Sequence, residues 1–437
     1  MVSMESKRLQ VVADFPFAQN RDFFPVLVET PPCSDCEVSV IVPVRNEAQT
    51  LTATLWALAN QVDLQGKALD FKRYEIILLL NNCTDDSAEI AHNFAQQHPN
   101  LVLHIVEKTL PPSEAYIGRV RQILMDEAYR RLSSLGRRRS IIASTDGDSQ
   151  VSSTWIAATL YEIARGADAV GGRIITNSSD RAALDPYARA CHLRDVGYRY
   201  LIAELESYLD PEPHDSFPRH HQHYGASLAV TTQMYAIAGG LPAVRTLEDV
   251  AFYQALVRVN ARFRHSPLVR VVTSARQTGR TDIGFANQLN EWSKMGQKKQ
   301  AFFVESAAAI ETRLLCRQKL RSMWCCVLNG KMPNCNDIAL LADTLGISEL
   351  WLISELAKLH TFGQLFEQVE QRVSKSGIWL SRWKKVEIEQ AIGDLRLRLE
   401  SLRFSHQKFY VEMSKSFSEQ KKEDQVKKAC NQDILNI

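Results

Sequence analysis

Two aspartates separated by a single glycine follow an apolar segment in the first half of the chain. The segment SIIASTDGDSQV, residues 140–151, begins like a buried strand and ends with Asp146, Gly147 and Asp148. Because glycine allows the backbone to turn tightly, both carboxylates can point toward one place. Carboxylate oxygens are hard ligands that suit Mg²⁺ or Mn²⁺ and the phosphates that such a cation carries. A solvated acidic turn explains the same pattern, so this turn alone leaves both interpretations open.

The composition is that of a globular protein. The chain has 437 residues, of which 45% are hydrophobic and 23% charged, enough for two or three domains with a large core. The 52 basic residues nearly balance the 50 acidic ones, and the net charge is +2. This balance offers no support for a nucleic-acid partner.

The cysteines and the apolar segments indicate the compartment. Nine cysteines are irregularly placed, and Cys33 and Cys36 form a CxxC pair without a second pair at zinc-site spacing. Reduced cytosolic thiols are the simpler interpretation. The first residues lack the apolar core of a signal peptide, and no segment approaches the ~20 apolar residues of a membrane span. We expect a cytoplasmic protein and leave contact with a membrane surface open.

Apolar segments typical of strands alternate with segments of helical spacing. The expected strands are residues 38–42, 74–80, 101–106, 141–145 and 169–176. The expected helices are residues 46–61, the segment that follows the NNCTDD turn, 118–134 and 155–166. This alternation predicts an α/β fold, with a mostly parallel sheet and helices on both faces.

Polar clusters follow three of these strands. They are Arg45-Asn46-Glu47, Asn81-Asn82 and the aspartate pair. In a parallel sheet, ligands bind outside the carboxyl ends of the strands. We therefore expect the three clusters to gather at one edge of the sheet, which favours the ligand-binding interpretation of the two aspartates.

The chain divides into three parts by pattern. Residues 1–36 read as an irregular arm, 37–290 as the α/β domain, and 291–437 as a helical region with a charged tail. Within the middle part, residues 177–225 lose the strand–helix alternation and include the His-rich segment PHDSFPRHHQHYG. In the last part, IWLSRWKKVEIEQ, which starts at Ile378, reads as an amphipathic helix that packs in the core or touches a membrane surface.

Five segments in order resemble family-2 glycosyltransferases of the GT-A fold. They are VSVIVPVRNEAQTLTATLWAL, NNCTDDSAEIA, GRVRQILMDEA, STDGDS with its DxD motif, and YGASLAVTTQMYAIAGG followed by LEDVAFYQALV with its ED motif. The resemblance covers about residues 37–285, and the C-terminal helical region lies outside it. It implies transfer of a sugar from a nucleotide-diphosphate donor to an acceptor hydroxyl.

The resemblance assigns roles to four carboxylates. Asp148 would bind Mn²⁺ or Mg²⁺, which neutralises the departing diphosphate, and Asp146 would hold the ribose or a metal-bound water. Asp249 matches the general base that deprotonates the acceptor, supported by Glu248. One base implies inversion at the anomeric carbon. Without the resemblance, Glu-Asp at a helix start is explained by the helix dipole alone.

Further matches lie on the nucleotide side. Pro43, Arg45 and Glu47 match the loop that borders base and ribose. Asn81 departs from the aspartate that reads uracil in many relatives, and its amide can still pair with a base edge. A UDP-sugar is favoured, with GDP- and dTDP-sugars left open. Arg119, like Arg121 two residues on, matches a position that contacts phosphate or faces solvent.

The acceptor and diphosphate side is expected to include His223, Gly225, Arg276 and Arg280, and the two arginines are expected to close over the diphosphate or the acceptor. The first two end the His-rich segment, which we interpret as a mobile acceptor loop. Residues 277–281 resemble the QxxRW motif of processive synthases but lack its tryptophan, so a processive enzyme is disfavoured. His265 is a candidate third metal ligand or a structural residue.

Other functions stay open on the same residues. A retaining transferase shares the fold, whereas a sugar-phosphate nucleotidyltransferase needs a Gly-rich loop where this chain has PVRNEA. A non-catalytic scaffold is disfavoured because Asp146, Asp148 and Asp249 are all present. The sequence does not identify the sugar or the acceptor.

Overall fold

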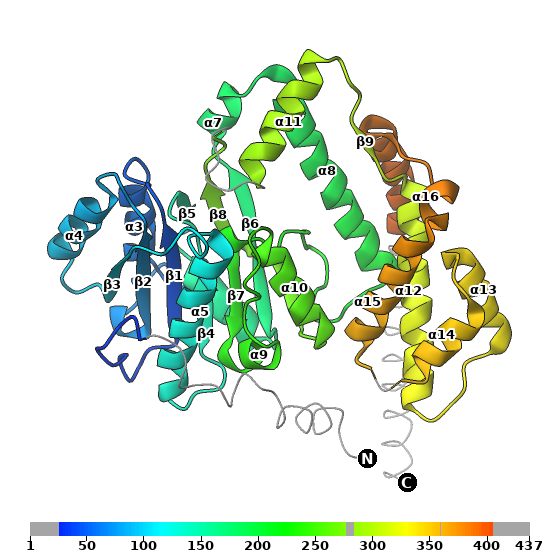
Figure 1. The fold of residues 1–437 in the computed structure, drawn as a ribbon, viewed down its shortest axis with the longest axis horizontal. Helices are drawn as coiled ribbons and strands as arrows, with labels where there is room; N and C mark the ends of the chain where they lie inside the picture. Colours follow the sequence, from blue (N-terminus) through cyan, green and yellow to red (C-terminus); the bar gives the residue numbers. More distant parts are fainter. Residues whose placement is uncertain (1–25, 277–283, 359, 405–437) are drawn as a thin grey trace, which may run out of the picture.

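An eight-stranded sheet forms the first part of the protein, and helices form the rest (Figure 1). The computed structural model describes residues 26–276, 284–358 and 360–404. The strands of the large sheet are β1 (Val38–Val44), β2 (Tyr74–Asn81), β3 (Leu103–Lys108), β4 (Ile141–Ser144), β5 (Ser149–Val151), β6 (Ala169–Thr176), β7 (Leu228–Thr231) and β8 (Phe263–Thr273).

The sheet is mostly parallel, with two antiparallel strands. Its order is β3-β2-β1-β4-β7-β6-β8-β5. β1 runs parallel to β2 and β4, and β6 runs parallel to β8, while β7 and β5 run antiparallel to their neighbours. The α/β fold expected from the sequence, followed by a helical region, is confirmed. β1 continues through Pro43 to Val44, two residues beyond the expected end.

Side chains of each central strand alternate between two apolar layers. In β2, Ile76, Leu78 and Leu80 face one layer, and Ile77 and Leu79 face the other. The first layer is covered by α3 (Leu51–Ala59), α4 (Ser87–Gln97) and α6 (Trp155–Ala164). The second is covered by α5 (Ile117–Ser134), α9 (Thr232–Ile237) and α10 (Glu248–Arg258). Because both faces are covered, the strands read as continuous apolar runs.

A buried ion pair links the sheet to α5. Arg131 of α5 donates from Nη2 to Glu75 Oε2 (2.6 Å) and from Nε to Oε1 (3.0 Å), and both side chains are 1% exposed. Burial alone would raise the pKa of Glu75, but hydrogen bonds with His104 and Arg131 lower it to about 2. The carboxylate therefore stays charged in the folded core.

Replacing Glu75 with glutamine should lower the free energy of unfolding at pH 7 by about 3–5 kcal/mol, since Arg131 keeps its buried charge without a partner. The pKa of Glu75 is about 2 when folded against 4.5 as the reference value, so its ionisation stabilises the fold fully above pH 4.5. That contribution disappears as the pH falls from 4.5 toward 2. Urea unfolding of both proteins across this range measures it.

Glu107→Gln is the matched control, because the exposed Glu107 pairs only with the exposed His92 among the described residues. It should change the unfolding free energy by less than about 1 kcal/mol. Equal effects of both substitutions, or a difference between wild type and Glu75→Gln that does not shrink in acid, would contradict the account of this pair.

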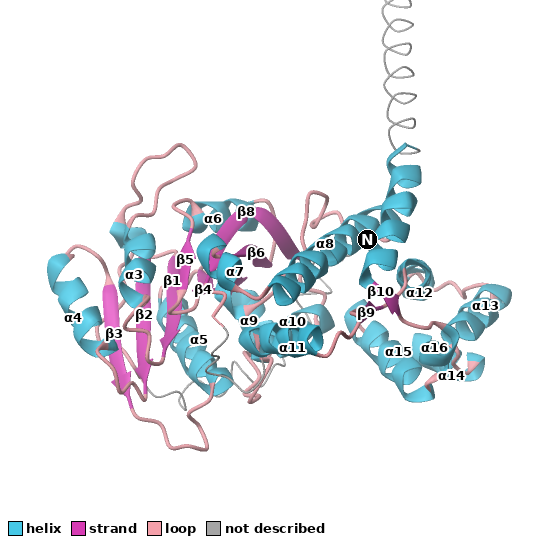
Figure 2. Cartoon of the chain, turned by 90° about the horizontal axis from the view of Figure 1, so that it is seen from above, coloured by secondary structure: helices cyan, strands magenta, loops and turns pink. Residues whose placement is uncertain are grey.

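A long helix, α8 (Pro186–Leu209), leads from the sheet to the C-terminal helices (Figure 2). The remaining elements are α7 (Ser178–Ala183), α11 (Phe285–Gln297), α12 (Ala307–Leu328), α13 (Cys335–Leu345), α14 (Glu349–Leu356), α15 (Phe362–Ser376), α16 (Ile378–Arg382), the short strands β9 (Phe303–Val304) and β10 (Val386–Glu387), and a helix over residues 388–404. The boundary expected between residues 290 and 291 lies inside α11, which packs on α8.

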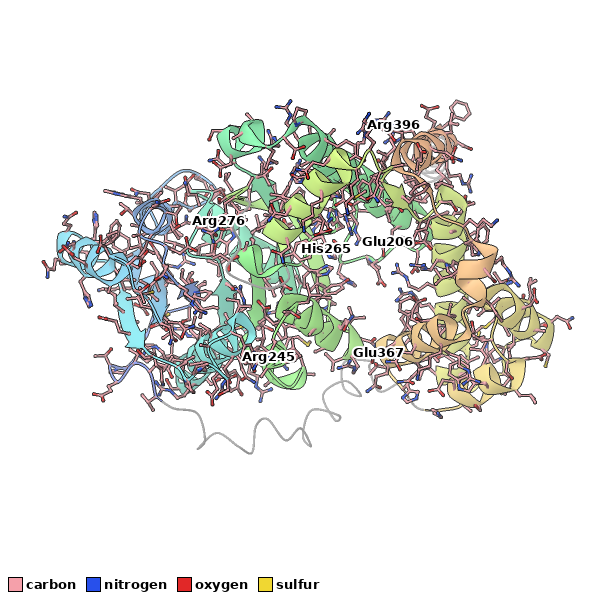
Figure 3. The ribbon with its side chains drawn as sticks, turned by 45° about the horizontal axis from the view of Figure 1, so that its top comes forward. Glu206, Arg245, His265, Arg276, Glu367 and Arg396 are labelled. Atoms are coloured by element: carbon pink, nitrogen blue, oxygen red, sulfur yellow. The ribbon has the colours of Figure 1, made fainter. Side chains whose placement is uncertain are left out.

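The C-terminal helices are joined to α10 by specific contacts. Arg258 forms a bidentate pair with Glu367 of α15 (2.6 and 2.7 Å), a residue labelled in Figure 3. A Cβ on Gly363 would come within 1.9 Å of the Val257 carbonyl oxygen, so the two helices touch at a glycine. The helical region therefore packs directly on the helix that begins at the predicted base.

The predicted amphipathic helix from Ile378 is wrong as a continuous element. α16 ends at Arg382, β10 follows, and a new helix starts at residue 388. Trp379 is buried among the C-terminal helices, in line with packing in the core. Across the described residues, every helix is too short or too polar to cross a membrane.

Candidate active site

The aspartate turn, residues 146–148, is packed against the loop that follows β1. A Cβ on Gly147 would lie 3.2 Å from Glu47 Cγ, so this glycine permits a close approach. Thr54 and Thr50 of the neighbouring helix start donate hydroxyl hydrogen bonds to the Gly147 carbonyl (3.0 and 3.3 Å). The turn is thus fixed against the first polar cluster, so two of the three expected clusters lie together at one edge of the sheet.

Asp148 and Glu47 share one arginine. Arg276 donates to both Glu47 oxygens (2.9 Å each), and its Nη2 lies 3.1 Å from Asp148 Oδ2. Burial, followed by the charge of Asp146, raises the pKa of Asp148, and Arg276 acts against this. Nearby negative charge therefore disfavours the ionised form of Asp148, and Arg276 offsets part of this effect.

A second arginine links Asp146 to the helix that carries the ED motif. Arg121 of α5 is 3% exposed and donates from Nη2 to Asp146 Oδ1 (2.9 Å) and from Nε to Glu248 Oε1 (3.1 Å). Its Nη1 donates to Ser144 Oγ (2.5 Å) and to the Gly225 carbonyl (3.1 Å). Four segments of the site therefore meet at one guanidinium.

Asp249 lies in the first turn of α10. Its Oδ2 accepts the Gly225 N–H (2.9 Å), and its Oδ1 accepts the Val250 N–H (2.8 Å). The preceding Leu247 has φ 57°, a left-handed conformation that turns the chain into the helix. A Cβ on Gly118 would come within 3.2 Å of Glu248 Cβ, so the starts of α5 and α10 touch. The half-buried carboxylate of Asp249 is thereby fixed on the same side as the aspartate turn.

The predicted nucleotide-side residues lie around the ends of β1 and β2. Pro43 is buried in β1, and Arg45 donates to the Ala115 carbonyl (3.2 Å). Asn81 is 4% exposed, and its Oδ1 is buried without a hydrogen-bond partner among the described residues. Arg119 donates to Gln122 (2.7 Å) and is one-third exposed. Because buried polar atoms are normally hydrogen-bonded, the Asn81 oxygen is the atom among these residues that most clearly calls for a partner from a ligand.

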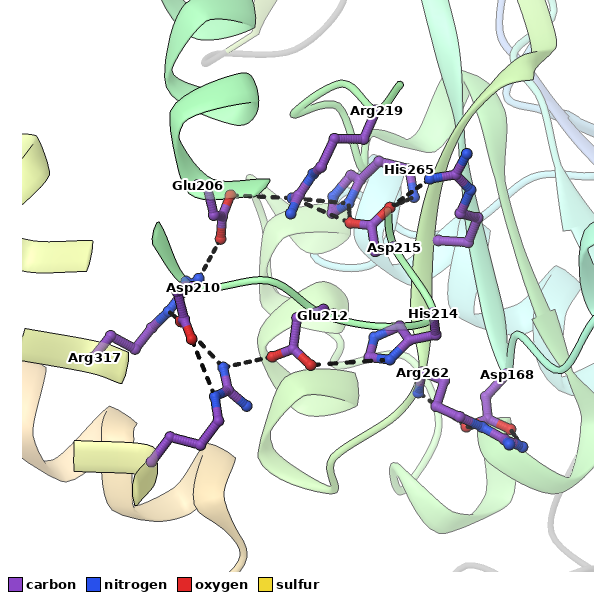
Figure 4. Close-up of polar contacts among 12 residues, drawn as sticks. Asp168, Glu206, Asp210, Glu212, His214, Asp215, Arg219, Arg262, His265 and Arg317 are labelled. Atoms are coloured by element: carbon purple, nitrogen blue, oxygen red, sulfur yellow. Dashed lines mark hydrogen bonds and ion pairs between the residues drawn. The ribbon is translucent and has the colours of Figure 1, made fainter. Parts of the chain in front are cut away.

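The His-rich segment is held by buried ion pairs, so the prediction of a mobile loop is wrong. Asp215 accepts from Arg264 (3.2 Å) and pairs with Arg219 (3.1 Å), which also reaches Glu206 of α8 (3.1 Å). Figure 4 shows this network together with contacts from Arg317 of α12. The sequence pattern does not reveal this network because Glu206, Arg264 and Arg317 lie on three separate elements, α8, β8 and α12.

His265 is not placed to share a metal with Asp148. Its neighbour on β6 is Gly171, whereas Thr273, beside the aspartate turn, pairs with Thr176. These two β6 residues are five positions apart, which corresponds to about 16 Å. Figure 3 shows His265 apart from Arg276, and its ring lies beside that of Tyr253 of α10, with centroids 5.9 Å apart. His265 is instead 3% exposed and bonded to Asp215 Oδ2 (2.7 Å), so the structural interpretation holds.

His223 stacks on Tyr253 of α10, with ring centroids 3.9 Å apart and planes at 8°. Burial, followed by the charge of His265, lowers the pKa of His223 to about 3, so the ring is neutral at pH 7. His223 thus packs against the helix that carries Asp249 in its first turn. Arg280, predicted on the same side, lies outside the described residues.

The structure therefore brings together the predicted Glu47, Asp146, Asp148, Glu248, Asp249, Gly225 and Arg276. Ser144, Thr50 and Thr54 contribute hydrogen bonds that the sequence did not indicate, because hydroxyl residues near strand and helix ends are common. In the described part of the chain, no group of three or more His, Cys, Asp or Glu side chains forms a metal site. A cation here would depend on the two carboxylates and on ligands from outside the protein.

Comparison with known proteins shows which family and which relatives this chain resembles. A model of the family described as "Glycosyl transferase family 2" matches residues 39–209. This segment includes the aspartate turn and ends before Gly225 and Asp249. Glycosyltransferase AglE of Haloferax volcanii is 28% identical over 138 residues, which is 31% of this chain and 39% of the relative. The match thus spans well under half of that protein's length.

Two solved structures show a low overall likeness. Mannosyltransferase PcManGT from Pyrobaculum calidifontis, in complex with GDP-Man and Mn²⁺, is 15% identical and has a TM-score of 0.40, covering 90% of this chain and 96% of its own. TarS 1-349 of S. aureus, in complex with UDP-GlcNAc, is 14% identical and has a TM-score of 0.41, covering 84% and 92%. At these scores, the fold assignment rests on the strand order itself.

Proposed function

Because a model of glycosyl transferase family 2 matches residues 39–209, we propose that the protein transfers a sugar from a nucleotide-diphosphate sugar to an acceptor hydroxyl. The observation that carries this proposal is the meeting of the aspartate turn and Asp249 at Arg121 and Gly225. A donor-side pair of carboxylates and a potential base thus border one site, as a displacement reaction requires.

The donor is proposed to lie over the ends of β1, β2 and β4. Asn81 would pair with the base, and Pro43, Arg45 and Glu47 would border base and ribose. Asp148 would bind Mn²⁺ or Mg²⁺ and Asp146 would assist, because carboxylate oxygens are suitable ligands for these ions. The two carboxylates also lie close enough for the charge of Asp146 to raise the pKa of Asp148. When bound, the cation supplies charge stabilisation for the diphosphate. A UDP-sugar is favoured and a GDP-sugar stays open.

The acceptor is proposed to approach from the side of Asp249. Asp249 accepts the hydroxyl proton while the hydroxyl oxygen forms a bond to the anomeric carbon. The bond from that carbon to the diphosphate oxygen breaks, and the diphosphate leaves with the electron pair. A single displacement of this kind inverts the anomeric carbon. Glu248 stays bonded to Arg121 (3.1 Å) and keeps the helix start in place.

A thermal-shift panel tests the donor assignment. UDP, GDP, dTDP and CDP are added with and without Mn²⁺ to the wild-type protein. We expect one diphosphate to raise the melting temperature in the presence of metal, because a ligand that binds the folded state stabilises it by mass action. If all four leave the melting temperature unchanged with and without Mn²⁺, the nucleotide site is refuted.

Asn81→Leu should weaken binding of the diphosphate found in that panel at least about tenfold, since the base loses a buried hydrogen-bond partner. The melting temperature without ligand should not fall, because the buried Oδ1 of Asn81 has no partner among the described residues. Asn100→Leu, in an exposed turn, is the control and should change neither value. If Asn81→Leu binds the diphosphate as tightly as the wild type, Asn81 does not contact the base.

A further inference from the structure

One buried arginine connects the donor half of the site to the acceptor half. The guanidinium of Arg121 binds Asp146 on the donor side, Glu248 on the acceptor side, and Ser144 and Gly225 between them. These partners lie 23 to 127 positions away in sequence. Since its N–H groups are directed at protein acceptors and its side chain is only 3% exposed, Arg121 is poorly placed to reach a phosphate in solvent.

Gly225 carries the effect of Arg121 to the predicted base. Its carbonyl accepts from Arg121 Nη1 (3.1 Å), and its N–H donates to Asp249 Oδ2 (2.9 Å). A Cβ at this position would lie 2.5 Å from Arg121 Cζ, so only glycine lets the backbone come this close. The guanidinium and the Asp249 carboxylate are therefore bonded to the two polar groups of one residue.

We propose that Arg121 is a positioning residue, which fixes the Gly225 peptide and through it the orientation of the Asp249 carboxylate. The same guanidinium holds the Asp146 side chain in a fixed position relative to Asp249. This inference rests on the proposed function. It replaces the two alternatives expected for Arg121, a phosphate contact or a solvent-facing position, with an action through Gly225, and it couples the donor turn to the base.

Lysine cannot replace this arrangement. Arginine offers five N–H donors in a rigid planar fork, of which four reach separate acceptors here. A lysine ammonium is a compact charge on a flexible stem, so it would keep the charge balance with Glu248 and Asp146 but lose the fixed geometry. Arg121→Lys thus separates geometry from charge.

Hydrogen exchange tests the proposed link without any substrate. The Gly225 amide should exchange at least about tenfold faster in Arg121→Lys and Arg121→Met than in wild type, as it should in Asp249→Ala, which removes the acceptor directly. Arg130→Met is the control on the same helix, where Arg130 pairs with Glu127. Its Gly225 amide should exchange at the wild-type rate. Unchanged exchange in both Arg121 variants would overturn the proposal.

A double-mutant cycle tests the functional consequence, with release of nucleoside diphosphate from GDP-mannose and UDP-N-acetylglucosamine as the readout. Arg121→Lys should lower kcat at least about tenfold in the wild-type background and less than about twofold in Asp249→Asn, because both changes remove the same positioned base. A purely structural role predicts equal losses in both backgrounds and a lower melting temperature, and that result would overturn the proposal.

The two tests distinguish a failure of the proposed function from a failure of the positioning role. If Asp249→Asn keeps wild-type turnover, the proposed base is refuted, whatever the exchange data show. If Asp249→Asn loses turnover but Arg121→Lys keeps it, only the positioning role of Arg121 is refuted.

Discussion

Asp249→Asn should lower the rate of sugar transfer by about 10²- to 10⁴-fold, which is the usual contribution of a positioned general base. Asparagine has nearly the same shape, and its one amide oxygen can still accept the Gly225 N–H that Asp249 Oδ2 accepts at 2.9 Å, while only the bond from the adjacent Val250 N–H is lost. It cannot take up the proton of the acceptor hydroxyl. The loss should therefore appear in kcat, with the melting temperature and the affinity for nucleoside diphosphate unchanged.

The matched control is Asp337→Asn. Asp337 also lies in the first turn of a helix, α13, and it pairs with Lys319 far from the site. This variant makes the same chemical change and should keep full turnover. A fall of less than about twofold in Asp249→Asn would show that its carboxylate is not the base, and the account of the acceptor side would have to be abandoned.

Asp148→Ala should abolish the metal-dependent stabilisation by nucleoside diphosphate. In the wild type, a ligand at 100 times its Kd stabilises the folded state by about 2.7 kcal/mol. Removing Asp148 removes the proposed cation ligand, so Mn²⁺ should no longer raise the affinity. The protein itself should fold, because Arg276 keeps its two hydrogen bonds to Glu47 (2.9 Å each). Melting curves with the diphosphate, with and without Mn²⁺, measure the effect.

Asp86→Ala serves as the control for this prediction. Asp86 lies at the same edge of the sheet, before α4, is exposed, and makes no side-chain capping bond. Its variant should show the full metal-dependent shift. If Asp148→Ala also retains that shift, Asp148 is not the ligand on which the cation depends, and its proposed role is refuted.

The sheet was predictable from the sequence because burial on both faces leaves a clear local signal. Segments such as Tyr74–Asn81 are continuously buried and read as apolar runs, and their order along the chain matches a parallel sheet. The antiparallel β7 and the C-terminal arrangement were not predictable in this way. α16 and β10 depend on packing against residues distant in sequence, which a local pattern does not record.

The candidate site was predictable as three clusters after strands, and its charge pairing was not. Arg276 meets Glu47 across 229 positions, and Arg121 meets Glu248 across 127. A single sequence contains no sign of such pairs. The His-rich segment was misjudged for the same reason, because Glu206 and Arg264 pair with its Arg219 and Asp215 from elsewhere in the fold.

The most direct test is proton NMR of GDP-mannose and UDP-N-acetylglucosamine incubated with the protein and Mg²⁺, a diamagnetic ion. Both donors are α-linked, so attack by water in place of the acceptor, assisted by Asp249, should release the β-anomer first, before mutarotation. The signal should be absent in Asp249→Asn. First appearance of the α-anomer would contradict single displacement, and consumption of neither donor above the buffer rate would contradict the proposed transferase activity toward them.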